Sequence, residues 1–398
     1  MPRQMKISVT MTSRTPTVSM TAKWAAKGGA DVLMIEKRQE IGSPVRCGEG
    51  IARSWLDRVG ITVDPKWVAR KVKGAKIVSP SGKHSLMIDE TKAGNEVGYV
   101  VDRVFFDKAL AADAARAGTK IMLKTSATSL VKEDGKIAGV RANSYGEPVE
   151  IRAKCVVGAD GFESQVGRWA GIDTTLKPSD ITTCYQYRLT NIDYDPDYNE
   201  FILGSVAPGG YAWVFPKDEN TANVGLGVLL SKLKHPGEVK EYLDRWIARD
   251  PRFKNGQPLE AVSGAVSVCA PLDSVTTDNL LLVGDSARMI DPITGGGISH
   301  SCLAGMFAGK VLAKGVQAND LSMNTLQEYE NAWREKMENS LWRDWMAKEK
   351  LITIPDETLD KLVEAVSKVD LQKITVHSLL AAVKQTYPDL VKEFEDLI

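Results

Sequence analysis

Three short apolar runs in this sequence each lead into an acidic residue, and that pattern is typical of strands that face a nucleotide. In the first, residues 32–35 are followed directly by Glu36. A carboxylate that ends the second strand of a β-α-β unit accepts hydrogen bonds from the two hydroxyls of an adenosine ribose. Glu36 is therefore the candidate ribose-binding residue, and an acidic surface residue at a strand end is the plain alternative.

The strongest candidate follows residues 280–283, where the chain continues as Gly284-Asp285 and then as the glycine-rich stretch 291–298. Asp285 can bind a chain of sugar-like hydroxyls. The glycines can direct the N-terminus of the next helix toward an electron-rich ring, whose reduced anionic form the helix dipole would stabilise. A loop that only packed a helix closely would not account for the Asp-Pro pair ahead of the glycines.

The third run, residues 154–158, leads into Ala159-Asp160-Gly161. The carboxylate of Asp160 can organise a tight turn, and Gly161 lets a ligand approach bare backbone. Taken alone, this match indicates only a turn. Together with the other two runs it predicts a nucleotide-binding sheet assembled from distant segments.

A phosphate-binding turn is expected at residues 13–18, between the first strand and the first helix. This stretch reads SRTPTV and has no glycine. Glycine is expected there because the turn needs positive φ and because the pyrophosphate must approach bare backbone. The free N–H groups of the helix start, the Arg14 guanidinium and the hydroxyls of Ser13, Thr15 and Thr17 are left as phosphate ligands.

The elements around these residues predict an α/β fold. A helix is expected over residues 107–117 and a strand over 120–124. The segment 181–268 instead alternates and is rich in aromatic residues, Gly and Pro, as an antiparallel sheet would be. We therefore expect three parts, namely a dinucleotide-binding domain formed by residues 1–175 and 265–320, a β-rich substrate domain over 176–264, and a helical region over 321–398.

Composition argues against several classes of function. Lys plus Arg and Asp plus Glu both number 51, so no overall positive charge would gather nucleic acid. The five cysteines include no CxxC pair and the four histidines show no ligand spacing, which argues against disulfides and metal sites. No apolar run reaches the roughly 18 residues of a membrane span, so we expect a cytoplasmic protein with peripheral membrane contact.

Two further motifs narrow the interpretation. Residues 41–50, IGSPVRCGEG, follow Glu36, and residues 208–216, PGGYAWVFP, form an aromatic motif. Together with Ala159-Asp160-Gly161 and Gly284-Asp285, these motifs resemble the archaeal geranylgeranyl reductases, which belong to a flavoprotein group that also contains aromatic hydroxylases. The resemblance covers nearly the whole chain after residue 19.

The resemblance implies a glutathione-reductase-like FAD domain, an inserted antiparallel substrate sheet and a C-terminal helical region. It implies FAD as the cofactor, with the family's phosphate-turn glycine falling at Thr17. The other FAD contacts that it implies are Glu36, Cys47, Gly48, Gly50, Arg103, Ala127, Asp285, Gly297 and Ile298. Cys47 would lie beside the flavin as a proton donor or a sensor of flavin position, and an inert buried thiol is the alternative.

The implied reaction is the FAD-dependent reduction of carbon–carbon double bonds in geranylgeranyl groups of archaeal lipid precursors, 2,3-di-O-geranylgeranylglyceryl phospholipids. Tyr211, Trp213 and Phe215 alternate along a predicted strand, so their rings would line one wall of an apolar tunnel, with core packing as the alternative. Reduced ferredoxin or NAD(P)H would supply electrons. A flavin monooxygenase or halogenase and a flavin-free lipid-binding paralogue are the alternative functions.

Overall fold

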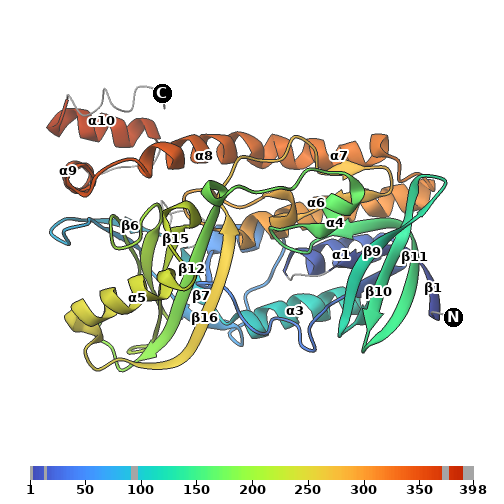
Figure 1. The fold of residues 1–398 in the computed structure, drawn as a ribbon, viewed down its shortest axis with the longest axis horizontal. Coiled ribbons are helices and arrows are strands. Elements are labelled where there is room, and N and C mark those ends of the chain that lie inside the picture. Colours follow the sequence, from blue (N-terminus) through green and yellow to red (C-terminus); the bar gives the residue numbers. More distant parts are fainter. Residues whose placement is uncertain (1–2, 13–15, 91–96, 370–375, 389–398) are drawn as a thin grey trace.

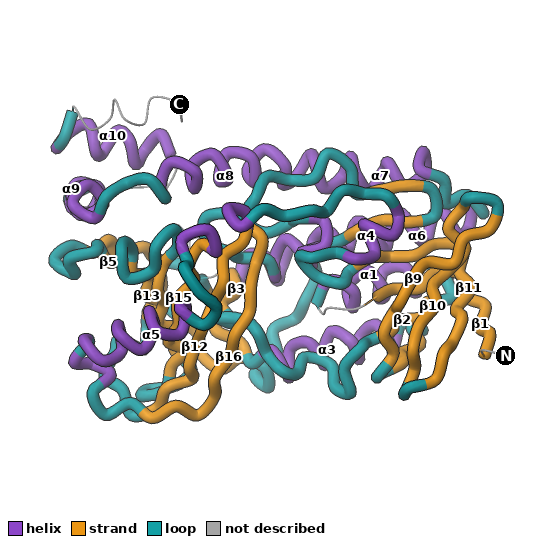
Figure 2. The backbone as a smooth tube through the Cα atoms, in the orientation of Figure 1, coloured by secondary structure: helices purple, strands orange, loops and turns teal. Residues whose placement is uncertain are grey.

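The computed structural model describes residues 3–12, 16–90, 97–369 and 376–388. One sheet and its helices form the right-hand part of Figure 1, and a second sheet forms the left-hand part. The helical run of α7 and α8 lies across both parts. Figure 2 shows loops and the helices α1, α3 and α4 between the strands of the two sheets.

The first sheet has eight strands, and its central path runs in the order β17-β18-β11-β1-β2-β8. The pairs β18–β11, β11–β1, β1–β2 and β2–β8 are parallel, while β9 and β10 extend the sheet in antiparallel pairing. The strand bounds are β1 Arg3–Thr12, β2 Val32–Ile35, β8 Lys120–Met122, β9 Thr125–Glu133, β10 Lys136–Ser144, β11 Glu147–Gly158, β17 Thr276–Thr277 and β18 Leu280–Leu282. Parallel pairing brings the carboxyl ends of β1, β2, β11 and β18 to one edge.

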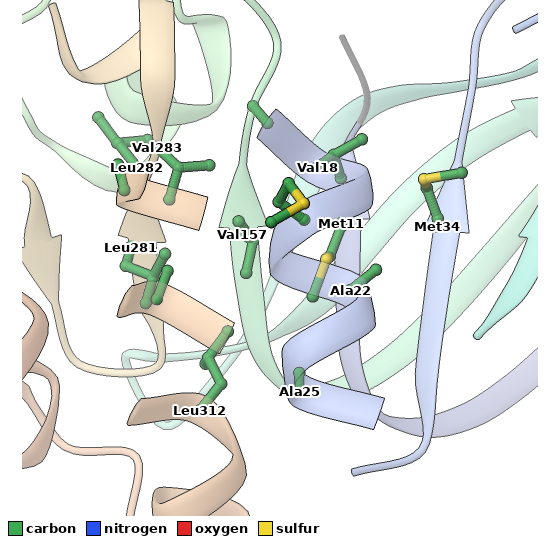
Figure 3. Close-up of a cluster of buried hydrophobic side chains, with 14 of the residues drawn as sticks. Met11, Val18, Ala22, Ala25, Met34, Val157, Leu281, Leu282, Val283 and Leu312 are labelled. Carbon is green, nitrogen blue, oxygen red and sulfur yellow. The ribbon is translucent and has the colours of Figure 1, made fainter. Parts of the chain in front are cut away.

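Helices α1 and α6 pack closely beside the first sheet because small residues face each other. A Cβ atom on Gly305 would lie 2.7 Å from the backbone oxygen of Thr17, and one on Gly309 would lie 2.5 Å from that of Thr21. Figure 3 shows the apolar side chains of α1 between β2 and the strand that carries Leu281 and Leu282. The helix bounds in this part are α1 Thr17–Lys27, α3 Arg103–Arg116, α4 Gln165–Ala170 and α6 Ile298–Ala318.

The second sheet has seven strands in the order β16-β12-β15-β14-β13-β5-β6, and it is antiparallel except where β13 pairs with β5. The strand bounds are β5 Gly74–Val78, β6 Ser85–Asp89, β12 Ile181–Thr190, β13 Tyr198–Ile202, β14 Tyr211–Pro216, β15 Ala222–Leu229 and β16 Gln257–Ser267. Helix α5, Glu238–Arg249, covers one face, where Val239 and Leu243 join the core formed by β14 and β15. The sheet thus combines residues 74–89 with a much later segment.

A small third sheet connects the two parts. It comprises β3 Gly50–Ala52, β7 Gly98–Val101 and β4 Val68–Lys71, all in antiparallel pairs. The short helix α2, Arg53–Arg58, follows β3 directly. This arrangement places the segment before β3 between the edge of the first sheet and the face of the second.

The C-terminal region is helical, as predicted. Helices α7, Met323–Trp333, and α8, Asn339–Leu351, are joined by a π-helical stretch and form one continuous run (Figure 1). The Tyr329 hydroxyl donates to the Leu282 carbonyl oxygen at 2.8 Å, which fixes α7 on the first sheet. Helices α9, Asp356–Ser367, and α10, Val376–Thr386, follow. Among the described helices, none combines the length and apolar character that crossing a membrane requires.

Candidate active site

A cavity of about 570 Å³ lies between the carboxyl edge of the first sheet and one face of the second. Its walls come from α1, the segment before β3, the glycine-rich loop before α6, and strands β12, β14 and β16. Most of the predicted site residues line it, namely Thr17, Glu36, Cys47, Gly48, Gly50, Arg103, Asp285, Gly297 and Ile298, together with Tyr211, Trp213 and Phe215.

Ala127 instead lines a smaller cavity of about 200 Å³. This cavity also involves Lys37, which directly follows Glu36, and Asp160 from the Ala-Asp-Gly turn. Glu36 lines the larger cavity, so adjacent residues of one chain segment border both spaces. An adenosine placed at Glu36 would therefore have a separate space for its base beside Ala127.

Glu36 is positioned by the end of β2. Its side chain is buried, and its Oε1 accepts a hydrogen bond from the Arg38 backbone N–H at 2.9 Å. The Glu36 backbone N–H donates to Met122 O at 2.8 Å, which continues the pairing of β2 with β8. A buried carboxylate at the carboxyl edge of parallel strands matches the acceptor that a ribose diol needs.

The glycine-rich loop places the start of α6 next to Asp285. The Asp291 carboxylate accepts from the backbone N–H groups of Ile293 at 2.9 Å and Thr294 at 3.1 Å, which fixes the turn. A Cβ atom on Gly297 would lie 3.3 Å from Asp285 Oδ1, so only a bare backbone leaves normal room there. Asp285 and the first residues of α6 therefore line the same cavity, and the N–H groups at a helix start have no partner within the helix.

Cys47 and Arg103 form the neighbouring wall. The Cys47 sulfur accepts from the Glu49 backbone N–H at 3.2 Å, and burial raises the pKa of the Cys47 thiol despite the positive charge of Arg103. The Arg103 guanidinium makes two hydrogen bonds of 2.9 Å to the Asp107 carboxylate. The Cys47 thiol therefore stays protonated at neutral pH.

Aromatic rings form the opposite wall. Tyr211, Trp213 and Phe215 alternate along β14, and successive ring centroids are 5.8 and 6.3 Å apart. Phe201 on the adjacent strand β13 joins them, with its centroid 5.3 Å from that of Phe215. The Trp213 indole N–H donates to Gln186 Oε1 at 2.9 Å. The three predicted residues therefore share one face, which both a substrate wall and a packed core require.

Lys348 and Glu49 lie at this cavity, and sequence reasoning assigned neither of them to the site. Lys348 reaches the cavity from α8 although its side chain is only 6% exposed, and nothing in the spacing of that helix marks it. Glu49 stands within the predicted Gly-Glu-Gly stretch, yet its partners are far away in the chain, including Lys217 at 168 positions. The flanking glycines were the only local signal for Glu49.

The phosphate turn is where the site departs from a usual dinucleotide site. Residues 13–15 lie outside the described residues, while Pro16 and Thr17 line the cavity. Thr17 is buried, and a Cβ atom on Gly284 would lie 2.5 Å from its Oγ1, so the threonine side chain packs directly on Gly284. FAD fits the carboxylate acceptors of Glu36 and Asp285 and the start of α6. The Thr17 side chain reduces the space that the FAD phosphates would occupy.

Comparison with solved structures gives the class of protein. The chain is similar to the flavin-dependent brominase Bmp2, with a TM-score of 0.70 and 17% identity over 98% of this chain and 93% of that one. It is likewise similar to the myxobacterial chondrochloren halogenase CndH, an FAD-dependent halogenase, with a TM-score of 0.70 and 15% identity over 98% and 97% of the two chains. At this identity the likeness shows the fold alone, and this fold is of the class that these FAD-dependent enzymes have.

Closer relatives give the family. A geranylgeranyl bacteriochlorophyll reductase-like structure from Thermoplasma acidophilum has a TM-score of 0.93 and 47% identity, covering 99% of this chain and all of that one (100%). The digeranylgeranylglycerophospholipid reductase of Thermoplasma acidophilum is 49% identical over 96% of this chain and 97% of its own length. That of Methanothrix thermoacetophila is 45% identical over 99% of this chain and 100% of its own length. The family model "Geranylgeranyl reductase catalytic domain" matches residues 180–266. The chain belongs to the digeranylgeranylglycerophospholipid reductase family, which confirms the predicted resemblance and fold class.

Proposed function

We propose that this chain uses FAD to reduce the carbon–carbon double bonds of geranylgeranyl groups in 2,3-di-O-geranylgeranylglyceryl phospholipids, yielding saturated phytanyl-type chains. The observation that carries the proposal is the cavity itself, in which the rings of Tyr211, Trp213 and Phe215 face the segment of Cys47 and the start of α6. Membership of the reductase family supports the same reaction.

The residues that would hold FAD follow from their positions. Glu36 would accept hydrogen bonds from the ribose, and the smaller cavity beside Ala127 would take the adenine. Asp285 would bind the ribityl hydroxyls, and the N–H groups at Gly297 and Ile298 would face the flavin ring, where the helix dipole favours its reduced anion. When bound, the reduced flavin supplies the hydride equivalent for the reduction.

The chain's own residues would bind the alkene, exclude water and supply the second hydrogen. An isolated double bond offers no polar group, so the aromatic wall would position it by apolar contact and stabilise a developing positive charge. The Cys47 thiol, which burial keeps in its protonated form, would deliver the proton from the opposite wall. Arg103 beside it would stabilise the thiolate left behind.

The lipid would enter from a membrane surface that α8 contacts peripherally. Trp342 and Met346 expose 38% and 45% of their surface on this helix, and Ile293, exposed by 38%, also lines the cavity. Lys348 reaches the cavity from the inner side of the same helix. Exposed apolar side chains on α8 and on the glycine-rich loop would suit contact with the interface of a bilayer on the cytoplasmic side. Reduced ferredoxin or NAD(P)H would supply the electrons.

The assignment of the nucleotide and the lipid to separate parts of the chain is also a proposal. The nucleotide would bind residues 1–175 and 265–320, the lipid would bind the sheet of residues 176–264, and the helices of 321–398 would cover both. Strands β5 and β6 complete the lipid-binding sheet from within the first range.

An anaerobic experiment tests the proposed function. The protein is loaded with FAD, reduced with dithionite and mixed with a digeranylgeranylglycerol phospholipid while the flavin absorbance is recorded. We expect reoxidation and a product mass gain of two hydrogens per double bond. Oxygen-dependent NAD(P)H consumption with an aromatic substrate would instead favour a monooxygenase or halogenase. Lipid retention without flavin absorbance would favour a flavin-free binding protein.

A further inference from the structure

Glu49 is a fully buried acidic residue that belongs to the flavin side of the cavity but is held by the substrate sheet. Its side chain has 0% exposure, and it lies between Gly48 and the first residue of β3. Its backbone has a φ of 75°, a conformation that costs a non-glycine residue on the order of 1 kcal/mol or more. Such a conformation persists only where surrounding contacts enforce it.

The contacts of the Glu49 carboxylate come from both parts of the molecule. Oε1 accepts from the Arg103 backbone N–H at 2.9 Å. Oε2 accepts from Arg188 of β12 at 2.9 Å, from Lys217 after β14 at 2.8 Å and from Asn223 of β15 at 2.7 Å. Burial raises the pKa of the Glu49 carboxyl, but Lys217 and the other donors outweigh it and the pKa is lowered. Glu49 is therefore an ionised link between the two parts.

The same sheet also holds the two cavity-lining residues that precede Glu49. The Gln186 side-chain amide donates to Cys47 O at 3.2 Å, and the Asn223 side-chain amide donates to Gly48 O at 3.1 Å. Gly48 lies against the aromatic wall, because a Cβ atom there would be 3.0 Å from Phe215 Cε2. Glu49 thus fixes the segment that sets the separation of the two cavity walls.

We propose that Glu49 is a positioning residue for the reduction, which holds the Cys47–Gly48 wall at the distance from the aromatic wall that places a lipid double bond for reaction. This inference rests on the proposed function. Hydride transfer needs reacting atoms within roughly 3–3.5 Å, and a misplacement of about 1 Å costs on the order of 100-fold in rate. Glu49 acts through Cys47 and Gly48, while the carboxylate itself faces Lys217 and Arg188.

The test compares Glu49→Gln with a matched control, Glu200→Gln. Glu200 lies on β13 of the sheet that holds Glu49, and its side chain is likewise buried, with 2% exposed. It pairs with Arg252 at 2.6 Å and with Lys76 at 3.2 Å, away from the cavity. The dithionite-reduced, FAD-loaded proteins are mixed with digeranylgeranylglycerol phospholipid at increasing concentrations. The readouts are the limiting rate of flavin reoxidation, the half-saturating lipid concentration, the Kd for FAD and the unfolding midpoint.

We expect Glu49→Gln to lower the limiting rate by about 100-fold while the half-saturating lipid concentration and the FAD Kd change less than about threefold. Glu200→Gln should lower the unfolding midpoint and leave the rate within about twofold of the unmodified protein. An unchanged rate in Glu49→Gln, or an equal loss of rate in Glu200→Gln, overturns the inference. Absence of reoxidation in the unmodified protein overturns the proposed function and this inference with it.

A second variant covers the outcome in which Glu49→Gln does not fold. Arg188 donates to Glu49 from the edge of the cluster, where its side chain is 23% exposed, and it also donates to Asn223 Oδ1 at 3.3 Å. Arg188→Gln leaves Glu49 its hydrogen bonds from Lys217 and Asn223. We expect a smaller loss of rate, about tenfold, which Arg188→Lys restores in part. Equal rates in Arg188→Gln, Arg188→Lys and the unmodified protein contradict the positioning role.

Discussion

The Tyr211 hydroxyl donates a hydrogen bond to the carbonyl oxygen of Thr294, and this contact joins the aromatic strand β14 to the glycine-rich loop before α6. Both residues line the large cavity. The contact therefore ties the proposed lipid wall directly to the loop that would face the flavin. It gives Tyr211 a polar role in addition to its place among the aromatic rings.

Removing this hydroxyl should loosen the two walls without emptying the cavity. We expect Tyr211→Phe to lose about 1 kcal/mol of unfolding free energy and to slow lipid-driven flavin reoxidation by about tenfold. Denaturant unfolding and anaerobic stopped-flow absorbance measure these effects. Tyr187→Phe is the matched control, because the Tyr187 hydroxyl donates to Asp244 of α5 at 3.1 Å on the far side of the same sheet. Equal rates for both variants would contradict the role of the Tyr211–Thr294 contact.

Thr17 should weaken FAD binding because its side chain occupies the place where a phosphate turn needs bare backbone. The Thr17 side chain packs on Gly284, and Thr17 lines the cavity. We expect Thr17→Gly to lower the FAD dissociation constant by about tenfold, equivalent to about 1.4 kcal/mol, as measured by quenching of flavin fluorescence. Glycine at Val18, and at positions 13 and 15 outside the described residues, is expected to act in the same direction.

Ser19→Gly provides the control for Thr17→Gly. Ser19 is buried in the same helix, but its hydroxyl faces Met34 Sδ at 4.0 Å rather than the cavity. A glycine there should destabilise the helix by up to about 1 kcal/mol without raising the affinity for FAD. Equal dissociation constants for Thr17→Gly and the unmodified protein would show that the Thr17 side chain does not weaken FAD binding.

The parts of the site that the sequence predicts are those governed by local rules. Glu36 and Asp285 each follow a short apolar run, and parallel pairing of the strands brings their ends to one edge. Tyr211, Trp213 and Phe215 share a face because side chains alternate along a strand. Ala127 lines the smaller cavity, a position that the family resemblance implied and that no spacing marks.

The remaining features depend on contacts between distant segments. The parallel pairing of β13 with β5 brings residues 74–78 into the seven-stranded sheet, and neither strand contains a sign of its partner. Glu49 pairs with the cationic side chains of Arg188 and Lys217, which lie more than 130 positions away in the chain. Without knowledge of these partners, the charge of Glu49 predicts a surface residue. Lys348 turns inward on a helix with charged residues on several sides. Such contacts form only when segments that are distant in the chain come together in the folded protein.

The close contact of α1 with α6 should be sensitive to one added methyl group. A Cβ atom on Gly305 would lie 2.7 Å from the Thr17 backbone oxygen and 3.0 Å from Met20 Cβ, so the helices must separate. We expect Gly305→Ala to destabilise the protein by about 1–3 kcal/mol in denaturant unfolding and to weaken FAD binding, because α6 begins at the cavity. In the control Gly264→Ala, the new methyl would meet Arg46 Cβ at an ordinary 3.6 Å, so its stability should change much less. Equal losses in the two variants would show that helix spacing is not the cause.

Asp344, on α8, should make the free energy of unfolding of the protein depend on pH. Burial and, to a smaller extent, the negative charge of Asp291 raise the pKa of its carboxyl from 3.8 to about 6, although Arg343 acts in the opposite direction. Because the pKa of Asp344 is higher in the folded than in the unfolded protein, its neutral carboxyl contributes to folding stability. This contribution is fully present below pH 3.8 and is lost as the pH rises through about 6. The cost of the charged form at pH 7.5 is on the order of 1–2 kcal/mol, since the side chain remains partly solvated.

Asp344→Asn removes this cost, so we expect the variant to be more stable than the unmodified protein at pH 7.5, and the advantage to vanish near pH 4. Denaturant unfolding across this pH range measures the difference. Asp320→Asn is the opposite-sign control, because a hydrogen bond from Thr325 lowers the pKa of Asp320, and its loss should reduce stability at pH 7.5. A stability difference between Asp344→Asn and the unmodified protein that stayed constant from pH 4 to 7.5 would show that Asp344 does not titrate in this interval.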